Sequence, residues 1–376
     1  MITVKEVKHP REIKAFVKFP FKLYKGSPYW VPPIIKEEIA VFDKDKNPAF
    51  ENADARLFLA YKNGEIAGRI AVIINRIEIE EQQKKKVRFG WFDVIDEIEV
   101  TKALLDKVTE IGRDHGLEYM EGPVGFSQMD KAGMLVRGFD KLSNMTTIYN
   151  YPYYPEHFKA LGFEEGAAWL EYLIRIPDEI PQKIDKFSDV ILRRYKLRVL
   201  RFKSSKELVA YADDMFDLMN RSFKDLQSFV PIQKAQIEQY KQKYLKFIHP
   251  DFIKFIVDEN DKMVAFSITM PSFSRALQKA NGKLFPFGFL HILRAQKTND
   301  SASLYLIGID PKYQNKGLTA IIFKETNRLF QRRGMRYVES NPELEENTAA
   351  HLLWKYYDDN EQHKRRVTWV KQLHDM

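Results

Sequence analysis

The stretch that decides the fold runs from Leu304 to Gly334 and reads LYLIGIDPKYQNKGLTAIIFKETNRLFQRRG. Its first part is apolar and ends at Asp310-Pro311, which predicts a β-strand that the proline terminates, because proline has no N–H for continued pairing. The apolar residues that follow have helical spacing and predict a helix from about Gly317 to Arg333, which Gly334 ends. The stretch therefore predicts a strand, a loop and a helix whose broad apolar face packs on a sheet.

The loop between this strand and helix is a candidate anion site. A helix N-terminus carries unpaired backbone N–H groups and the positive end of the helix dipole. Gly317 would let the backbone approach a bulky anion such as a pyrophosphate, and Lys312 and Lys316 add positive charge. The alternative is an ordinary turn that the glycine serves sterically, because Q-x-x-G-x-T is a weak motif by itself.

A similar order of elements occurs earlier in the chain. Residues 56–61 and 66–74 flank Asn63-Gly64, a type I′ hairpin signal, and residues 252–257 and 263–270 flank a turn at Asn260-Asp261. Each hairpin is followed by a predicted strand, helix and strand, at residues 89–95, 97–115 and 117–121 in the first copy and 303–309, 317–333 and 336–340 in the second. The sequence thus predicts a duplicated α/β fold with a mixed sheet.

The spacing of the two copies locates their main difference. Glu121 and Glu339 are 218 positions apart, whereas Asp96 and Asp310, at the preceding strand ends, are 214 apart. The strand-to-helix loop is therefore four residues shorter in the first copy, which lacks the residues that would hold a pyrophosphate. A proline-containing linker at 176–188 predicts domains at 1–180 and 190–376.

Composition restricts the setting and the chemistry. The chain has 376 residues, a net charge of +8 and no cysteine, which removes disulfides and thiolate chemistry. The charged N-terminus has no signal-peptide pattern, so we expect a cytoplasmic protein. The histidines lack metal-ligand spacing, so we expect no metal. Basic clusters favour anionic partners, or are solvated faces, and occur at Lys84-Lys85-Lys86 with Arg88, at Arg193-Arg194 and at Lys364-Arg365-Arg366.

The region after the second copy's last repeat strand adds a family resemblance. The segment Asn347 to Tyr357 reads NTAAHLLWKYY and matches N-x-x-A-x-x-L at Asn347, Ala350 and Leu353. Together with Ile309-Asp310-Pro311 and the Gln314 to Thr319 loop, it resembles the GNAT superfamily of acyl-CoA-dependent N-acyltransferases. The resemblance covers most of residues 200–376, and the whole chain is similar to the two-domain members of that superfamily.

The resemblance implies two tandem GNAT-like folds and an acetyl-CoA or longer acyl-CoA donor. Backbone groups near Ile307 and Ile309 would pair with the pantetheine arm, and Asn347 would contact the arm from the opposite side. An amine would attack the thioester directly. The pyrophosphate would be held by the backbone amides of Gln314, Asn315, Lys316, Gly317, Leu318 and Thr319.

The catalytic residues are less well specified than the donor loop. We expect Glu339 to be the general base, with a structural salt bridge as the alternative for this carboxylate. Thr319 stands where the loop usually ends in glycine or alanine. Trp354 stands where the family commonly has a tyrosine acid, and Tyr356 or Tyr357 would have to replace it.

The first copy and the acceptor leave alternatives open. We interpret the first copy as a degenerate domain that shapes the acceptor site or is structural, and the acceptor as a small-molecule or lipid-like amine. A non-catalytic module that binds acyl-CoA or a nucleotide is one alternative, and a basic nucleic-acid-binding protein is another. The basic clusters also leave peripheral contact with an anionic membrane open, whereas no recognition helix or stacking motif favours nucleic acid. No sequence feature specifies the oligomeric state.

Overall fold

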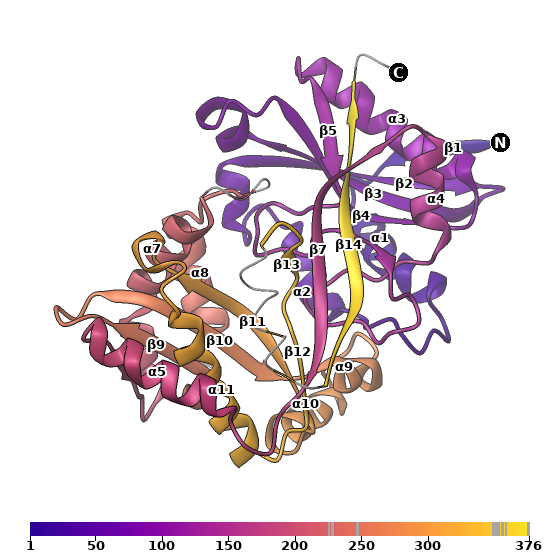
Figure 1. Ribbon diagram of the computed structural model, residues 1–376. Coiled ribbons are helices and arrows are strands. Elements are labelled where there is room, and N and C mark those ends of the chain that lie inside the picture. Colours follow the sequence, from indigo (N-terminus) through magenta and orange to yellow (C-terminus); the bar gives the residue numbers. More distant parts are fainter. Residues whose placement is uncertain are drawn as a thin grey trace. The chain divides into compact units, whose positions relative to one another are not determined.

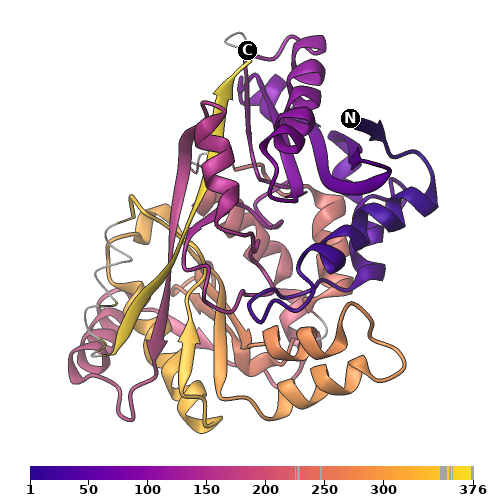
Figure 2. The same ribbon diagram turned by 90° about the vertical axis from the view of Figure 1, so that its right-hand side faces the viewer.

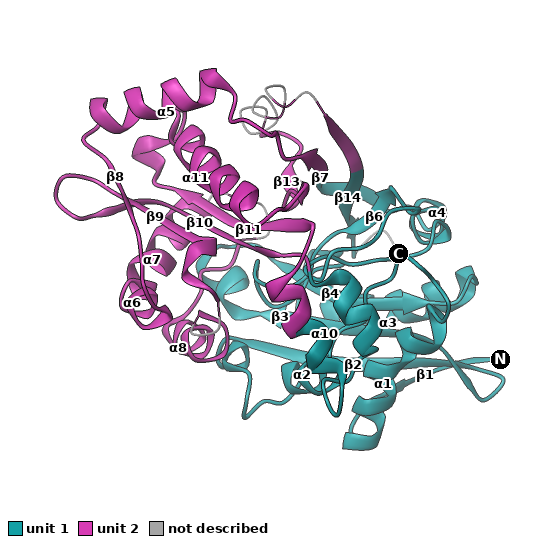
Figure 3. Cartoon of the chain, turned by 90° about the horizontal axis from the view of Figure 1, so that it is seen from below, with its two compact units in different colours: residues 1–169, 273–292, 364–376 teal, residues 170–272, 293–363 magenta. Residues whose placement is uncertain are grey.

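The computed structural model describes residues 1–224, 226, 229–245, 248–347, 354, 357 and 359–373. By its contacts the chain forms two compact units with interleaved segments (Figure 3). Unit 1 contains residues 1–169, 273–292 and 364–376, and unit 2 contains residues 170–272 and 293–363. The segment expected to be a linker contributes the start of a helix to unit 2. The domain boundary between residues 180 and 190 stays a prediction of where the second repeat begins.

Unit 1 is built on a mixed sheet with the strand order β1-β2-β3-β4-β5-β14, and β6 pairs with β14 (Figure 1). Among the described residues of this unit, β4 and β5 pair in parallel and the other strand pairs are antiparallel. Its strands are β1 (Ile2–Glu6), β2 (Ala53–Lys62), β3 (Glu65–Asn75), β4 (Lys86–Val94), β5 (Tyr119–Gly122), β6 (Met134–Arg137) and β14 (Asn360–Gln372), whose first residues belong to unit 2.

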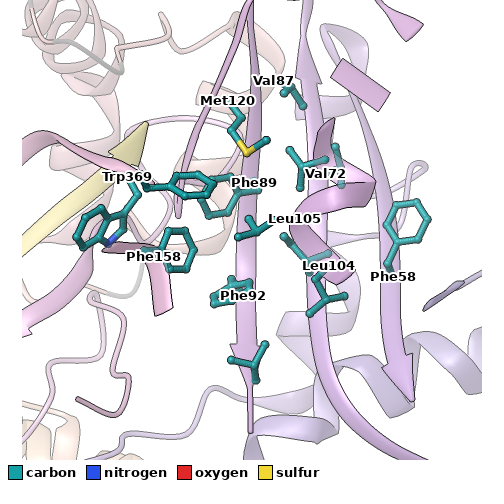
Figure 4. Close-up of a cluster of buried hydrophobic side chains, with 14 of the residues drawn as sticks. Phe58, Val72, Val87, Phe89, Phe92, Leu104, Leu105, Met120, Phe158 and Trp369 are labelled. Carbon is teal, nitrogen blue, oxygen red and sulfur yellow. The ribbon is translucent and has the colours of Figure 1, made fainter. Parts of the chain in front are cut away.

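Unit 1 also contains helices, and two of them form the first core with the sheet. The helices are α1 (Pro10–Leu23), α2 (Ile35–Val41), α3 (Ile98–Asp114), α4 (Tyr153–Ala160), α9 (Ser274–Ala280) and α10 (Gly288–Lys297), whose last residues belong to unit 2, with short turns at Pro48–Glu51 and Ile77–Glu81. Leu104 and Leu105 of α3 pack on strand residues such as Phe89 and Val72, beside Phe158 of α4 (Figure 4). The amphipathic pattern of α3 thus positions it on the β3–β4 face.

Unit 2 repeats this architecture with the strand order β7-β12-β11-β10-β9-β8, and β13 pairs with β7. Here β11 and β12 are the parallel pair. The strands are β7 (Glu164–Arg175), whose first residues belong to unit 1, β8 (Arg198–Leu200), β9 (Ile253–Val257), β10 (Met263–Pro271), β11 (Ser301–Ile309), β12 (Tyr337–Glu339) and β13 (Glu343–Leu344). The helices are α5 (Gln182–Arg194), α6 (Ser205–Ala210), α7 (Ala212–Phe223), α8 (Lys234–Lys243) and α11 (Leu318–Arg332), with short turns at Pro250–Phe252 and Pro311–Tyr313.

The repeat predicted from the sequence is confirmed. Both hairpins and both strand–helix–strand segments form where they were expected. Asn63 and Gly64 have φ of 52° and 83°, as a type I′ turn requires. Residues 119–121 of β5 align with 86–88 of β4, and residues 337–339 of β12 align with 301–303 of β11. Glu121 and Glu339 are therefore equivalent positions in the two sheets.

Two of the basic clusters considered from the sequence are partly internal. Lys86 and Arg88 are about 1% exposed, and Lys86 forms ion pairs of 2.9 Å with Glu78 and 2.6 Å with Glu121. Lys364 and Arg366 are likewise buried. The sequence cannot distinguish Lys86 and Arg88 from surface charges, because their carboxylate partners come from other elements. No helix among the described residues is long and apolar enough to cross a membrane.

Candidate functional site

The parallel strands β11 and β12 part after a short paired stretch. Their register runs from Ser301–Tyr337 to Ser303–Glu339 and ends there, although β11 continues to Ile309. Beyond Glu339 the chain turns to β7, where the Ser340 amide donates to the Tyr172 carbonyl at 2.8 Å. β13 then pairs with β7. The second half of β11 is therefore paired with β10 on one side and has no strand register on the other among the described residues.

This half of β11 also contains a bulge. Ile268 and Thr269 of β10 are consecutive, but they face Leu306 and Leu304, so Tyr305 is the extra residue. A bulge re-aims the backbone groups beside it. Tyr305, Leu306, Ile307 and Ile309 are only half-buried. The strand thus presents backbone and side-chain surface at the place where its parallel neighbour has left.

A long loop connects β11 to α11. Residues 310–317 form it, whereas only residues 95–97 separate β4 from α3. The Arg221 guanidinium donates to the Asp310 carboxylate, which also accepts from the Lys312 amide at 2.9 Å. Gln314, Asn315 and Lys316 are exposed, and the Lys316 ammonium lies over the Tyr195 and Tyr313 rings. The loop is therefore fixed at its base and open at its tip, next to the helix N-terminus.

Gly317 has two reasons to be glycine. Its φ is +83°, in the left-handed region, and it precedes the first residue of α11. A Cβ at this position would lie 2.5 Å from the Phe187 ring of α5. One side of the glycine therefore faces a protein side chain, so that close approach by an anion, as the sequence suggested, has to come from the other side.

Three ionisable side chains meet where β11 and β12 part. Glu339 of β12 is 13% exposed and its Oε1 lies 3.2 Å from Nε2 of His363, on β14, which is 5% exposed. The fully buried Glu171 of β7 completes the group, and one ligand atom from each residue lies within 4.8 Å of the others. Since these residues come from three strands, no spacing in the sequence could have indicated that they meet. Glu171 and His363 were missed for this reason.

This group has two chemical uses. Carboxylates in contact with an imidazole can take a proton from an ammonium ion and pass it on. Two carboxylate oxygens and one imidazole nitrogen are also a donor set that suits a divalent cation such as Zn²⁺. The expected absence of a metal stays a prediction, and metal analysis of the purified protein checks it.

Solved structures with a similar arrangement identify the fold. The tandem GNAT protein from the clavulanic acid biosynthesis pathway superposes with a TM-score of 0.55 at 11% identity, covering 99% of both chains. A GCN5-related N-acetyltransferase from Sphaerobacter thermophilus gives a TM-score of 0.53 at 12% identity, with 99% of this chain and 96% of that chain covered. This chain has the tandem GNAT fold. The resemblance stated from the sequence is confirmed at the level of fold.

Relatives of this tandem GNAT chain are more similar in sequence than the solved structures are. Protein YghO of Escherichia coli K12 is 26% identical over 369 residues, which cover 96% of this chain and 93% of that protein. The bacterial ceramide synthase of Caulobacter vibrioides is 24% identical over 322 residues, which cover 83% and 82%. No family model matches the sequence.

A fourth ionisable residue in the second GNAT copy escaped the sequence analysis. Burial raises the pKa of Glu343 to about 7, although the Trp354 indole N–H donates to its carboxylate at 3.0 Å. Glu343 lies on β13, four residues after Glu339. A pKa near neutrality is what a proton-transfer group requires, but a carboxyl buried in a core also shows it. The sequence could not indicate this raised pKa, because the desolvation of Glu343 depends on how the chain packs around it.

The remaining site residues predicted from the sequence fall into three groups. Ile307, Ile309 and the loop from Gln314 to Thr319 are brought together around the end of β11 and the start of α11. Asn347 lies after β13, with its amide bonded to the Leu344 carbonyl at 2.9 Å. Tyr356, like Ala350 and Leu353, lies outside the described residues.

Trp354 and Tyr357 belong to the core of unit 2. The Trp354 ring packs against Phe323 of α11 and Tyr172 of β7. The Tyr357 hydroxyl accepts from the Asn327 side chain at 2.7 Å, and burial raises its pKa to about 12. Both aromatic side chains therefore belong to the hydrophobic cluster that includes residues of α11. Packing in this cluster explains the tryptophan at position 354, where the family commonly has tyrosine.

Proposed function

We propose that the chain is an acyl-CoA-dependent N-acyltransferase and that its second GNAT copy holds the donor. The observation that carries this proposal is the parting of β11 and β12, with an exposed glycine-containing loop at the end of β11 and the Glu171–Glu339–His363 group where the strands part. The fold of the solved neighbours and the name of one relative support acyl transfer.

The donor would bind along β11. The first amides of a helix precede its own hydrogen-bond ladder. The Ala320 amide donates to the Gly317 carbonyl at 3.0 Å, so the amides of Leu318 and Thr319, with the loop, would hold the CoA pyrophosphate, and Lys316 would add positive charge. The pantetheine arm would follow the half-exposed backbone at Ile307 and Ile309. The bulge at Tyr305 would direct a backbone N–H toward the thioester carbonyl and stabilise the oxyanion that forms on attack.

Proton transfer would use the buried acidic group. The acceptor reaches the site as an ammonium ion and must lose a proton before its nitrogen attacks. Glu339 would take this proton, with His363, 3.2 Å away, holding the carboxylate in place. The new C–N bond forms, the C–S bond breaks, and the second proton that the nitrogen loses balances the one that the departing CoA sulfur takes up as thiol. Glu171 contributes to the field of the group, which favours a cationic acceptor.

The acceptor is a lipid-like amine in this proposal. The support is the Caulobacter relative that bears the name bacterial ceramide synthase. A ceramide is an amide between a fatty acid and a long-chain amino alcohol, so a related enzyme would use a long acyl chain and a long-chain amine. A water-soluble amine with an acetyl donor is the competing assignment within the same reaction.

An assay of thiol release tests the proposal. The chain has no cysteine, so any free thiol that Ellman's reagent detects in a mixture of protein, acyl-CoA and amine comes from CoA. Acetyl-CoA, octanoyl-CoA and palmitoyl-CoA are compared, with sphinganine, a polyamine and an aminoglycoside as acceptors, and amide products are verified by mass spectrometry. We expect turnover that is highest with the long donor and sphinganine and is lost in Glu339→Gln.

Two results would count against this assignment. CoA binding without turnover over the whole panel would favour the non-catalytic binding module. The absence of any CoA binding by the folded protein would remove the donor itself and with it the acyltransferase assignment.

A further inference from the structure

The second GNAT copy contains an insertion that the first copy lacks. Residues 272–300 connect β10 to β11, whereas residues 76–85 connect the equivalent strands β3 and β4. The insertion forms α9, a turn and α10, drawn in orange in Figure 2. It joins β11 at Ser301, the end of the strand opposite to the loop at 310–317. The insertion and the proposed pyrophosphate loop therefore join opposite ends of β11.

The turn and α10 display apolar side chains to solvent. Phe285 and Phe287 are 77% and 70% exposed, and Leu290 and Leu293 are 50% and 46% exposed. These are four of the nine large hydrophobic residues that are exposed in the described part of the chain. α10 has no buried residue. A helix that packs only within its own protein would bury an apolar stripe, so this arrangement indicates an external apolar partner.

Backbone hydrogen bonds and close packing fix the turn that carries these apolar side chains. The Phe289 amide donates to the Leu284 carbonyl at 2.7 Å, and a Cβ on Gly288 would lie 1.9 Å from the Lys283 carbonyl oxygen. The turn is therefore tight enough to require glycine. At its base, the Gly282 carbonyl accepts from the Ile35 amide at 2.9 Å, which ties the end of α9 to the start of α2 within unit 1.

Positive charge surrounds the apolar side chains. From Ser274 to Asn299 the sequence has no aspartate or glutamate and has the exposed cations Arg275, Lys279, Lys283, Arg294 and Lys297. No ion pair to these five is found among the described residues. Leu290, Leu293, Arg294 and Lys297 have the i, i+3, i+4, i+7 spacing of one helix face. Long cationic side chains on such a face reach phosphate groups while apolar neighbours enter the acyl layer.

We propose that residues 274–297 dock this protein on an anionic phospholipid surface. Phe285, Phe287 and the leucines would enter the interface, and the five cations would contact lipid phosphates. A second protein chain would fit the apolar residues as well, but the uncompensated positive charge is complementary to anionic lipid. α10 is far too short to span a bilayer, so the attachment is peripheral. The proposal does not depend on the acyltransferase reaction.

Vesicle co-sedimentation tests the docking directly. The purified protein is mixed with sucrose-loaded vesicles of phosphatidylcholine alone or with phosphatidylglycerol, and the bound fraction is measured against lipid concentration. We expect binding to the anionic vesicles that is weakened about tenfold or more in Phe285→Ser/Phe287→Ser. Binding of Lys279→Ala/Lys283→Ala to the anionic vesicles should weaken about fivefold for each cation removed, and high salt should weaken vesicle binding further.

Matched variants separate the proposed surface from general effects. Tyr244→Ser removes an exposed aromatic ring elsewhere, and Lys14→Ala/Lys18→Ala removes two exposed cations of α1. Both should bind vesicles as the wild type does, and circular dichroism should show that every variant is folded. Equal binding to neutral and anionic vesicles, or no effect of the two phenylalanine substitutions, would overturn the proposal. A dimer in light scattering that only those substitutions dissociate would show a protein interface instead.

Discussion

The two GNAT copies differ in the path that the chain takes after the same pair of parallel strands. In the first copy the chain continues from β5 directly along β4, where the Val124 amide donates to the Phe89 carbonyl at 2.8 Å. A Cβ on Gly90 would lie 2.4 Å from the Val124 carbonyl oxygen. Eight of the nine β4 residues are buried. In the second copy the chain leaves β11 after Glu339, and the middle of β11 stays half-exposed.

This difference explains why a duplicated fold would keep one donor site. The backbone of residues 122–126 occupies the side of β4 along which a pantetheine arm would have to lie. The equivalent glutamates show the same divergence. Glu121 is held by Lys86 and by the Thr368 hydroxyl, at 2.6 and 3.1 Å, in a closed ion-pair network, whereas Glu339 faces His363 and Glu171. The same position thus stabilises one copy and is available for chemistry in the other.

Substituting the equivalent glutamates should separate these roles most strongly. Glu339→Gln should lower kcat/KM by about 10²- to 10⁴-fold, because it removes the proposed base. Glu121→Gln should lower the free energy of unfolding by about 3–5 kcal/mol, because it leaves Lys86 buried without its closest carboxylate. Steady-state assays and urea unfolding of both variants check this. An unchanged rate in Glu339→Gln, or an equal loss of rate in a folded Glu121→Gln, would contradict the division.

Glu343 should make the second copy's stability depend on pH. Its pKa in the folded protein is about 7, above the ordinary 4.5, so folding favours the protonated form. Its stabilising contribution is complete below about pH 4.5 and is lost as the pH rises through about 7, which amounts to about 3 kcal/mol. Urea unfolding should show that the free energy of unfolding of Glu343→Gln rises by about this amount, relative to that of the wild type, between about pH 5 and about pH 8. A difference that does not change with pH would refute the raised pKa.

Gly317 allows a smaller and more local test of the donor loop. Gly317→Ala places a Cβ in a left-handed residue and against Phe187, so CoA affinity should fall about tenfold. Gly334→Ala is the matched control, because Gly334 also has a positive φ but ends the same helix with open space around it. Adding Phe187→Ala should recover part of the loss. Equal effects of the two glycine substitutions in calorimetry would show that the loop has no special role.

Trp354 should have the smallest effect. Trp354→Tyr restores the residue type that the family commonly has, but this side chain packs in the core, so kcat should change by no more than about twofold. Loss of the indole contact with Glu343 should cost about 1 kcal/mol of stability. A large gain in kcat would instead show that a missing acid limits the enzyme.

The sequence predicted the repeated elements well because their signals are local. Asn63-Gly64 specifies a hairpin by its dihedral angles, and Gly334, which has a positive φ, ends the helix before it. The sequence also located the loop difference and the equivalence of Glu121 and Glu339. These inferences need only periodicity, turn residues and counting along the chain.

The rest depends on packing between distant segments. Lys86 and Arg88 look like a basic surface in sequence, and only the positions of Glu78 and Glu121 make them internal ion pairs. His363 joins Glu339 because β14 contributes residues to both units. Residues 122–126 cover one side of β4 because of the path of their backbone, and no residue type in the sequence predicts that path. Burial, which sets the pKa of Glu343, is equally invisible in the sequence.

The most direct test of the division between the two copies is the stoichiometry of CoA binding. Isothermal titration of CoA into the wild type and into Gly317→Asp, with Gly334→Asp as the control, measures both the number of sites and their place. One CoA per chain is expected, with affinity lost in Gly317→Asp and kept in Gly334→Asp. Two CoA molecules per chain, or unchanged affinity in Gly317→Asp, would contradict a single donor site in the second copy.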